Sequence, residues 1–201
     1  MIFVTVGAQM PFDRLVRAVD AWAARCGNGG VFAQIGRGGY RPAHLRYVEF
    51  LEPRAFWTTF TNASAIVAHA GMGTIISALE LGKPILVMPR RGDLAETRND
   101  HQLATAQRFR ELGLVEVAFH ESELPDRLDQ LARWPRPGLS DHCICGRVLA
   151  GCPHAGAACA TPHLGTACPH LLATLRGFVT TGALPSPASD TMTPRPTGQW
   201  L

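Results

Sequence analysis

The stretch of the chain at residues 65–91 joins two short apolar segments through a glycine-rich turn and an amphipathic segment. Its continuous apolar runs at 65–68 and 85–88 are typical of parallel strands that are buried on both faces. The segment between them has helical periodicity and should end at Gly82, with Pro84 beyond it. One face of this helix carries three apolar residues, Ile75, Ala78 and Leu79. The stretch therefore predicts a strand, a loop, a helix and a second strand of a parallel sheet.

The turn before this helix has the chemistry of an anion site. Gly71 and Gly73 leave no side chain between the main-chain amides and a ligand, and the helical turn after them has unpaired N–H groups and a positive dipole end. His69 stands at the carboxyl end of the expected strand, the edge where open parallel sheets bind ligands. A histidine satisfied by a neighbouring carbonyl is the alternative for His69 alone. The glycines and the helix start after it favour a phosphate-binding site.

Strands and helices are expected to alternate over the rest of the first two thirds of the chain. Apolar runs predict four further strands, at residues 2–6, 31–35, 47–50 and 115–118. Periodicity and capping signals predict helices at 12–22, 54–60 and 100–112, and a last helix with Ser122 as its N-cap and Pro125 in its first turn. This alternation predicts an α/β fold with a doubly wound parallel sheet. Gly7, after the first strand, either approaches the same ligand or makes a plain turn.

The composition argues against several classes of protein. The chain has 201 residues and a net charge of +3, and its arginines are scattered, so binding of nucleic acid has little support. No apolar run is long enough to span a bilayer, and the first residues lack the basic and apolar regions of a signal peptide. Of six cysteines only Cys26 lies in the patterned part of the chain, which fits a reducing compartment. We expect a cytoplasmic protein.

From about residue 137 the pattern gives way to a sequence rich in Ala, Gly, Pro, Thr, Cys and His. Such a sequence buries too little apolar surface to offset the entropy of ordering, so we expect a folded domain at 1–134 and a low-order tail at 135–201. Six tail residues are potential zinc ligands: Cys143, Cys145, Cys152, His154, Cys168 and His170. Their C-x-C and C-x-H spacings differ from the usual C-x-x-C knuckles, and no metal site is expected.

Four motifs, in this order along the chain, resemble one known family. They are VTVGAQMPFDRLV at 4–16, HAGMGT at 69–74, GKPILVMPR at 82–90 and RNDHQ at 98–102. On these motifs, residues 1–134 resemble the C-terminal, donor-binding half of family 28 glycosyltransferases. Within that family the chain is similar to the stand-alone soluble subunit of two-part enzymes. Examples are the bacterial exopolysaccharide glucuronosyltransferases and the eukaryotic N-acetylglucosaminyltransferase of lipid-linked oligosaccharide synthesis.

The resemblance implies a fold and a set of binding residues. The fold is a Rossmann-like sheet domain that forms one half of the GT-B architecture and holds a UDP-sugar at the carboxyl edge of its sheet. The donor diphosphate is implied to lie at a helix start, against His69, Gly71, Met72, Gly73 and Thr74. His101 and Gln102 are implied to reach the sugar hydroxyls. From the residues alone, Asn99, His101 and Gln102 open a helix beside the same edge, and an ordinary helix cap is the alternative.

Two positions depart from the pattern of the family. Where many relatives place an acid that grips the ribose hydroxyls, this chain has Ser77, with Glu80 one turn later. Where relatives commonly have a threonine in the first loop, this chain has Ala8, next to Gly7. We take Ser77, Glu80 and Gly7 as further candidate contacts with the UDP-sugar.

The expected activity is transfer of a sugar from a UDP-sugar to a lipid-linked saccharide, in exopolysaccharide or glycolipid synthesis. The chain has no Asp-x-Asp motif, and the resemblance implies that helix dipoles rather than a metal stabilise the departing diphosphate, so neither a metal nor another cofactor is expected. No catalytic base is evident in the motifs, although Asp13 and Glu96 are candidates. The resemblance implies that a membrane-associated partner subunit binds the acceptor, supplies the base and holds this chain at the inner face of the membrane.

Three alternatives come from other classes of protein. A dinucleotide-dependent oxidoreductase would need a third glycine where the chain has Ile76. A phosphate-loop nucleotidase would need Ser or Thr where Pro84 follows Gly82 and Lys83. A non-catalytic subunit that binds a nucleotide-sugar or stabilises its partner fits the same residues. The sequence favours a glycosyltransferase over the first two and leaves the third open.

Overall fold

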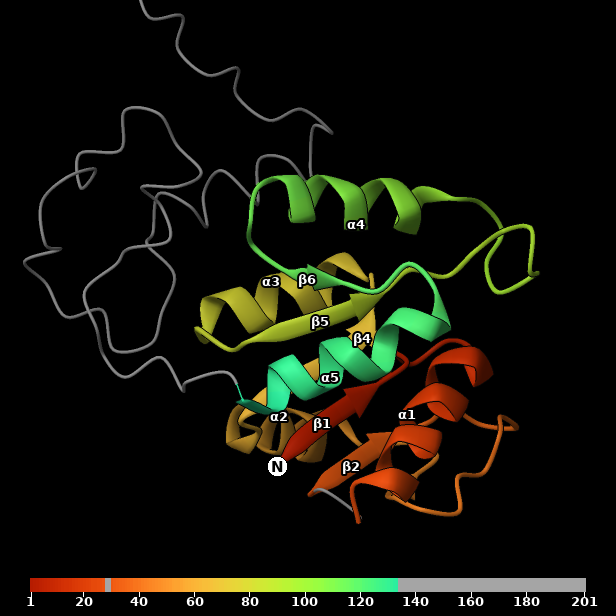
Figure 1. The fold of residues 1–201 in the computed structure, drawn as a ribbon, viewed down its shortest axis with the longest axis vertical. Coiled ribbons are helices and arrows are strands. Elements are labelled where there is room, and N and C mark those ends of the chain that lie inside the picture. The colour runs from red at the N-terminus through yellow and green to blue at the C-terminus, as the bar shows by residue number, and fades with distance from the viewer. Residues whose placement is uncertain (28–29, 134–201) are drawn as a thin grey trace, which may run out of the picture.

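The computed structural model describes residues 1–27 and 30–133, which are coloured in Figure 1. The tail expected at 135–201, with its cysteines and histidines, lies outside these residues. Within the two described ranges, no helix is both long enough and apolar enough to cross a membrane.

Six parallel strands form one sheet at the centre of the described part of the chain (Figure 1). They are β1 (Ile2–Thr5), β2 (Val31–Gln34), β3 (Arg46–Val48), β4 (Ala65–His69), β5 (Ile85–Met88) and β6 (Glu116–Val117). Their order across the sheet is β3-β2-β1-β4-β5-β6, and every neighbouring pair is parallel. The chain thus runs outward from β1 to β3 and returns to the centre at β4. This confirms the Rossmann-like, doubly wound sheet that the sequence predicts.

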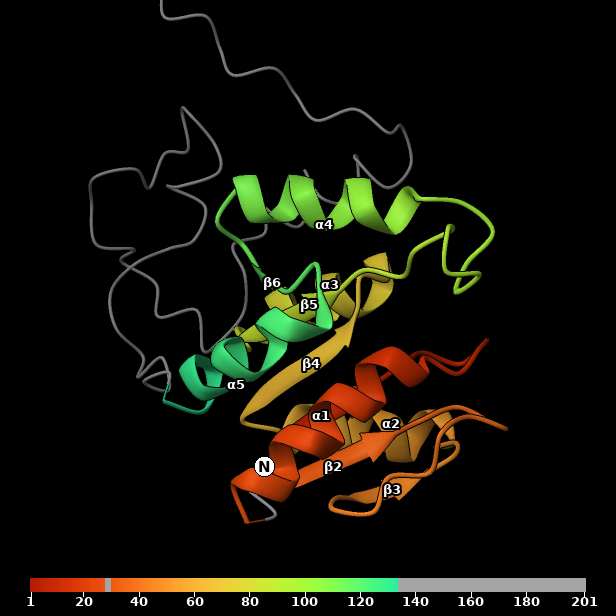
Figure 2. The ribbon, with the colours of Figure 1, turned by 45° about the vertical axis from the view of Figure 1, so that its right-hand side comes forward.

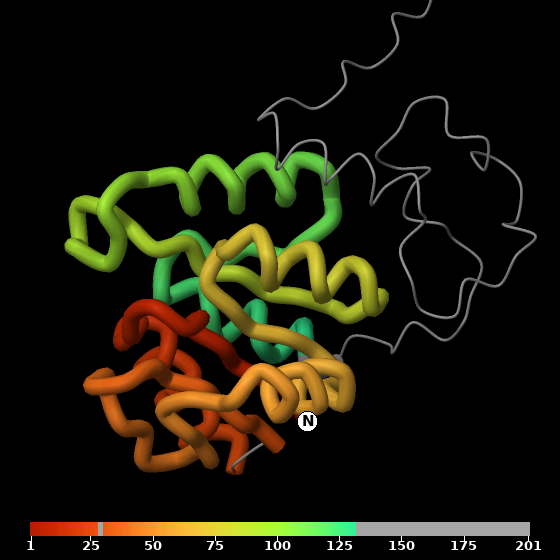
Figure 3. Tube along the Cα trace, turned by 180° about the vertical axis from the view of Figure 1, so that it is seen from behind, coloured from red at the N-terminus to blue at the C-terminus, as the bar shows by residue number. Residues whose placement is uncertain are grey.

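Helices cover both faces of this sheet, as the two views in Figures 1 and 2 show. One face packs against α1 (Asp13–Arg25) and α5 (Leu124–Arg133). The opposite face packs against α2 (Pro53–Asn62), α3 (Met72–Glu80) and α4 (His101–Glu111). In Figure 3, which is seen from behind, α2 and α3 lie toward the viewer. The sheet is therefore enclosed between two helical layers, each with its own apolar core.

The central strands supply side chains to both cores in alternation, because successive residues of a strand point to opposite faces. In β1, Phe3 packs in the core beneath α2, α3 and α4, whereas Ile2 and Val4 pack beneath α1 and α5. In β4, Ile66 packs in the same core as Phe3, and Val67 packs in the same core as Ile2 and Val4. Every residue of β1 and β5 is buried, which explains why these strands are apolar in the sequence apart from Thr5.

Two elements differ from the sequence prediction. The strand expected at 47–50 is β3 and lies at Arg46–Val48. It ends at Val48 because this residue pairs with Gln34, where the neighbouring strand β2 also ends. Ser122, expected as an N-cap, lies inside a 3₁₀ turn at Glu121–Glu123 that leads directly into α5. Pro125 does lie in the first turn of that helix, as predicted. Pairing with β2 sets the bounds of β3, and the 3₁₀ turn sets the start of α5. Both depend on neighbouring segments of the chain.

Candidate functional site

The carboxyl ends of β1 and β4 meet at the point where the strand order reverses. From there the chain after β1 turns to α1 on one face of the sheet, and the chain after β4 turns to α3 on the other face. Ligands of open parallel sheets bind at such a switch point. Gly7 follows β1 and His69 is the last residue of β4. The fold therefore brings together two predicted binding residues that are far apart in sequence.

The imidazole of His69 lies between two glycines. A Cβ atom at Gly71 would overlap the Nε2 atom of His69, and a Cβ atom at Gly7 would lie 2.8 Å from its Cε1 atom. Gly7 also has a φ of +82°, a backbone conformation that favours glycine. A Cβ atom at Gly73, by contrast, would meet no atom within 4 Å. Gly7 and Gly71 thus make room for the imidazole, whereas Gly73 faces open space; the sequence alone did not separate these two functions of the glycines.

His69 is uncharged at neutral pH. Burial, followed by the positive charge of Arg90, lowers the pKa of His69 to about 4. Within the described residues no hydrogen bond of normal length and angle reaches the buried Nδ1 atom, but the main chain of Thr5 lies close enough to raise the pKa of His69, so the alternative of a neighbouring carbonyl stays open. A neutral imidazole has one donor and one acceptor nitrogen. His69 can therefore offer a ligand a hydrogen bond but not a positive charge.

The first turn of α3 presents main-chain amides beside His69. Its N-cap residue, Gly71, has an extended backbone without a side-chain cap, and the first helical hydrogen bond runs from Ile75 N to Gly71 O. The amides of Met72, Gly73 and Thr74 precede that bond, so the helix itself provides them with no acceptor. The positive end of the helix dipole lies at the same place. The structure thus assembles the anion-binding geometry that the glycine pattern predicts.

Ser77 and Glu80 lie further along α3, one turn apart and both partly exposed. Their helical positions place them opposite the buried Ile75 and Ala78. Both residues therefore lie on the solvent side of the helix whose first turn carries the open amides, and both remain predicted contacts with the ribose.

Two buried polar side chains, Thr5 and Gln34, hold the loop after β1. The amide of Gly7 donates to Thr5 Oγ1 at 3.2 Å, and Gln34 Nε2 donates to the carbonyl of Gly7 at 3.4 Å. The sequence analysis did not identify either residue. The sequence does contain a feature that could have identified them, because each is a polar residue that ends an otherwise apolar buried strand.

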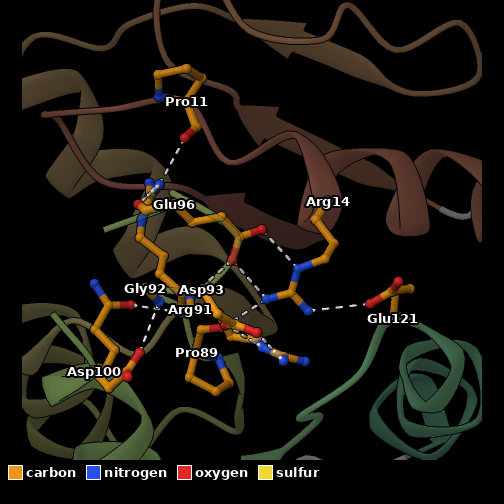
Figure 4. Close-up of polar contacts among 11 residues, drawn as sticks. Pro11, Arg14, Pro89, Arg91, Gly92, Asp93, Glu96, Asp100 and Glu121 are labelled. Atoms are coloured by element: carbon orange, nitrogen blue, oxygen red, sulfur yellow. Dashed lines mark hydrogen bonds and ion pairs between the residues drawn. The ribbon is translucent and has the colours of Figure 1, made fainter. Parts of the chain in front are cut away.

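The two carboxylates considered as bases are engaged in structural contacts. Glu96 accepts hydrogen bonds from two nitrogens of Arg14 at 2.8 and 2.9 Å and from the amide of Arg91 at 3.0 Å (Figure 4). Both side chains of this ion pair are largely buried. Asp13 accepts a hydrogen bond from the amide of Tyr40 at 2.9 Å. Glu96 therefore ties the loop after β5 to α1, and Asp13 holds the loop after β2.

The polar residues at the start of α4 divide into two kinds. Asn99 and His101 are exposed, and Asn99 Oδ1 contacts His101 Nδ1. Gln102 is buried, and its Oε1 atom accepts a hydrogen bond from the amide of Arg90 at 3.1 Å. This contact places Gln102 at the carboxyl end of β5, next to the switch point. Asp100 is the N-cap residue of α4 but makes no side-chain cap, so the alternative of an ordinary cap is not supported.

Among residues 1–27 and 30–133, no three His, Cys, Asp or Glu side chains lie close enough together to hold a metal ion. The site consists of main-chain amides, a neutral histidine and hydroxyl or amide side chains around the ends of β1, β4 and β5.

Comparisons with known proteins show which proteins the chain is similar to. The chain is 29% identical to the "UDP-N-acetylglucosamine transferase subunit ALG13" of Eremothecium gossypii over 148 residues, covering 56% of this chain and 71% of that protein. Among solved structures, the solution structure of ALG13 matches with a TM-score of 0.47 at 23% identity, covering 67% of this chain and 86% of that one. The glycosyltransferase SnogD of Streptomyces nogalater matches with a TM-score of 0.46 at 23% identity, covering 66% of this chain and 34% of that one.

The chain thus spans about a third of the length of glycosyltransferases such as SnogD. The model of the family described as "Glycosyltransferase family 28 C-terminal domain" matches residues 1–135, which include all six strands and five helices of the described part. This chain belongs to the glycosyltransferase family 28 C-terminal domain family.

Proposed function

We propose that this protein is the donor-binding subunit of a metal-independent glycosyltransferase. It binds a UDP-sugar at the switch point between β1 and β4, and the sugar passes to a lipid-linked saccharide in exopolysaccharide or glycolipid synthesis. The observation that supports this most directly is the open start of α3, where Gly73 faces free space beside the neutral imidazole of His69. The relative named ALG13 is itself described as a subunit of a UDP-N-acetylglucosamine transferase.

The donor diphosphate fits the start of α3 on physical grounds. Free amides and the positive end of a helix dipole stabilise an anion, and this stabilisation increases as negative charge develops on the departing diphosphate. His69 adds one neutral hydrogen bond at the same place. We place the sugar near Asn99, His101 and Gln102, and the ribose near Ser77 and Glu80. The contact of Gln102 with the amide of Arg90, at the end of β5, supports the first assignment, and the position of Ser77 and Glu80 on the solvent side of α3 supports the second.

The acceptor and the catalytic base belong to a partner in this proposal. Glu96 is paired with Arg14, and Asp13 is bound to the main chain of Tyr40, so neither carboxylate of the sequence analysis is placed to take a proton from an acceptor. The described sheet domain alone leaves the donor open to water, and most of the rate advantage from orientation would be missing. We therefore propose a membrane-associated subunit that closes over the donor and holds this cytoplasmic chain at the membrane.

Replacing Gly73 by alanine tests the donor site. Alanine favours the helix by about 0.5–1 kcal/mol, and the new Cβ meets no protein atom, so the variant should be at least as stable as the wild type. The same Cβ would stand over the amides that we assign to the diphosphate, and UDP affinity should fall by about tenfold or more. Calorimetry with UDP and UDP-sugars, beside thermal unfolding of both proteins, measures the two effects separately.

His69→Ala and titration with NAD complete this experiment. His69→Ala should also weaken UDP binding, because it removes the donor beside the diphosphate. A wild-type chain that binds NAD tightly and does not respond to UDP would contradict the glycosyltransferase assignment. A Gly73→Ala variant with unchanged UDP affinity would show that the diphosphate does not lie on α3.

Dependence on a partner is tested by transfer assays. Purified chain should bind UDP-sugar yet transfer little sugar to a lipid-linked acceptor, and membranes that contain the partner should restore transfer. Robust transfer by the purified chain alone would contradict the two-subunit arrangement. The alternative is a non-catalytic subunit that binds nucleotide-sugar or stabilises its partner. In that case the reconstituted complex should keep its activity when His69 and Gly73 are replaced.

A further inference from the structure

Arg90 is a buried cation at the carboxyl edge of the sheet, directly beyond β5. Arg90 is only 4% exposed, and its guanidinium lies 4.7 Å from the centre of the Phe12 ring. The carboxylate that acts on its charge is that of Glu96, which is itself paired with Arg14. Burying a charge in this way is unfavourable unless hydrogen bonds compensate for the lost water. The arginine therefore must be satisfied by groups of the main chain.

The guanidinium binds four carbonyl groups in two segments of the chain. One nitrogen donates to Pro11 O at 2.7 Å and to Glu96 O at 3.3 Å. The other nitrogen donates to Val6 O at 2.9 Å and to Met10 O at 2.7 Å. Three of these acceptors lie in the loop after β1, which contains Gly7. One planar side chain from the end of β5 thus binds both the beginning and the end of this loop.

One of these bonds acts directly on the donor site. The carbonyl of Val6 and the amide of Gly7 belong to the same peptide unit, in which the carbonyl accepts from Arg90 and the N–H donates to Thr5 Oγ1 at 3.2 Å. This peptide unit is therefore held from both sides. Gly7 then packs against the imidazole of His69, where even a methyl group would be too close. A path of contacts connects Arg90, the Val6–Gly7 peptide and His69.

We propose that Arg90 is a positioning residue of the donor site, which sets the place of the His69 imidazole by fixing the loop after β1. The inference rests on the proposed function, because it assumes that His69 meets the donor. It assigns no contact between Arg90 and the ligand, since the guanidinium is used by the four carbonyls. The amide of Arg90 also donates to Gln102 Oε1 at 3.1 Å, so the same residue joins the start of α4 to this loop.

The arginine fork is needed for this function, and a positive charge alone is not enough. Arginine presents five N–H groups in a rigid plane, whereas lysine offers one compact ammonium group. A lysine at position 90 could not reach the carbonyl groups of Val6, Pro11 and Glu96 at the same time. Arg90→Lys therefore preserves the charge and removes the geometry. Arg91, the next residue, is more exposed and binds Asp93, so Arg91→Lys is a matched control.

The test compares Arg90→Lys and Arg91→Lys by NMR and calorimetry. In Arg90→Lys, the Gly7 amide and the His69 ring signals should shift and UDP should bind about tenfold more weakly. Arg91→Lys should leave the signals and the affinity at wild-type values. Thermal unfolding of each variant shows whether the protein is folded. A folded Arg90→Lys with wild-type signals, or with wild-type UDP affinity, would overturn the proposal.

Two other outcomes are also decisive. If the wild type does not bind UDP, the proposed function fails, while the Gly7 and His69 signals of the variants still report whether Arg90 positions them. If Arg90→Lys does not fold, Arg90→Gln is measured in the same way. Failure of both variants to fold would make Arg90 a general stability residue and refute a specific positioning function.

Discussion

Lowering the pH from about 7 to about 4 is expected to reduce the free energy of unfolding by ~3 kcal/mol through His69 alone, because its pKa in the folded protein is about 4. An unfolded histidine has a pKa near 6.5 and takes up a proton over this range. The folded protein keeps His69 neutral, so the unfolded state binds more protons and stability falls as the pH falls. The stabilisation is fully present above the unfolded pKa and is lost between about 6.5 and about 4.

The physical cause is the position of the ring between Gly7 and Gly71. Burial opposes the charged form first, and the buried cation Arg90 opposes it further. Asp20 acts at lower pH, because main-chain amides of Ala43 and His44 hold its pKa below the usual value, and the stability from this contact is lost only as the pH falls through that lowered pKa. Measurements above about pH 4 therefore report mainly on His69 rather than on Asp20.

Denaturant unfolding of the wild type and of His69→Gln, at several pH values between about 7 and about 4, tests this expectation. Glutamine does not titrate, so the difference in pH slope between the two proteins isolates the histidine, whatever the absolute stability of the variant. Equal slopes would show that His69 is accessible to water and readily protonated. The neutral donor that we assign to the diphosphate would then have to be reconsidered.

Gly71→Ala should lower the free energy of unfolding by about 1–3 kcal/mol, the usual range for a group forced into a packed site. The added methyl would overlap the imidazole of His69, which cannot retreat because Gly7 lies against its other side. The φ of Gly71 is −81°, so backbone strain makes no contribution and the effect is steric. Gly73→Ala, two residues later, is the matched control and should be neutral or stabilising.

A double variant separates the clash from other effects of the methyl group. Removing the ring with His69→Ala should make the Gly71→Ala substitution nearly neutral, since the atom it overlaps is absent. The coupling between the two substitutions should then be about as large as the effect of Gly71→Ala alone. Additive effects in this cycle would contradict the packing of His69 against Gly71.

Much of the fold follows from local patterns. The buried strands β1, β4 and β5 are continuous apolar runs, and α3 lies between a glycine turn and Gly82, as the sequence predicts. The predicted core face of α3 is also correct, with Ile75, Ala78 and Leu79 buried. These features are predictable because burial on both faces of a strand, or on one face of a helix, imposes a period on the sequence. The edge strand β3, which is buried less, was placed less well.

A candidate site could be proposed from the sequence, but the contacts within it could not. A histidine and two glycines before a helix are enough to predict an anion site at a strand end. Nothing in that pattern distinguishes Gly71, which makes room for the imidazole, from Gly73, which faces open space. Glu96 looks like a candidate base in the sequence and is an ion-pair partner of Arg14 in the structure. Such differences depend on residues from distant segments.

The sequence by itself therefore determined the order of the elements, the parallel sheet and the edge at which we expect a ligand, because local periodicity and glycine placement specify them. Only the tertiary structure decided that His69 is neutral and enclosed, and that Arg90 holds the loop of Gly7. The contact between Val6 and Arg90 spans 84 positions of the chain. Burial, pKa and hydrogen-bond partners are properties of such non-local contacts, and they exist only once the strands have been brought together in one sheet.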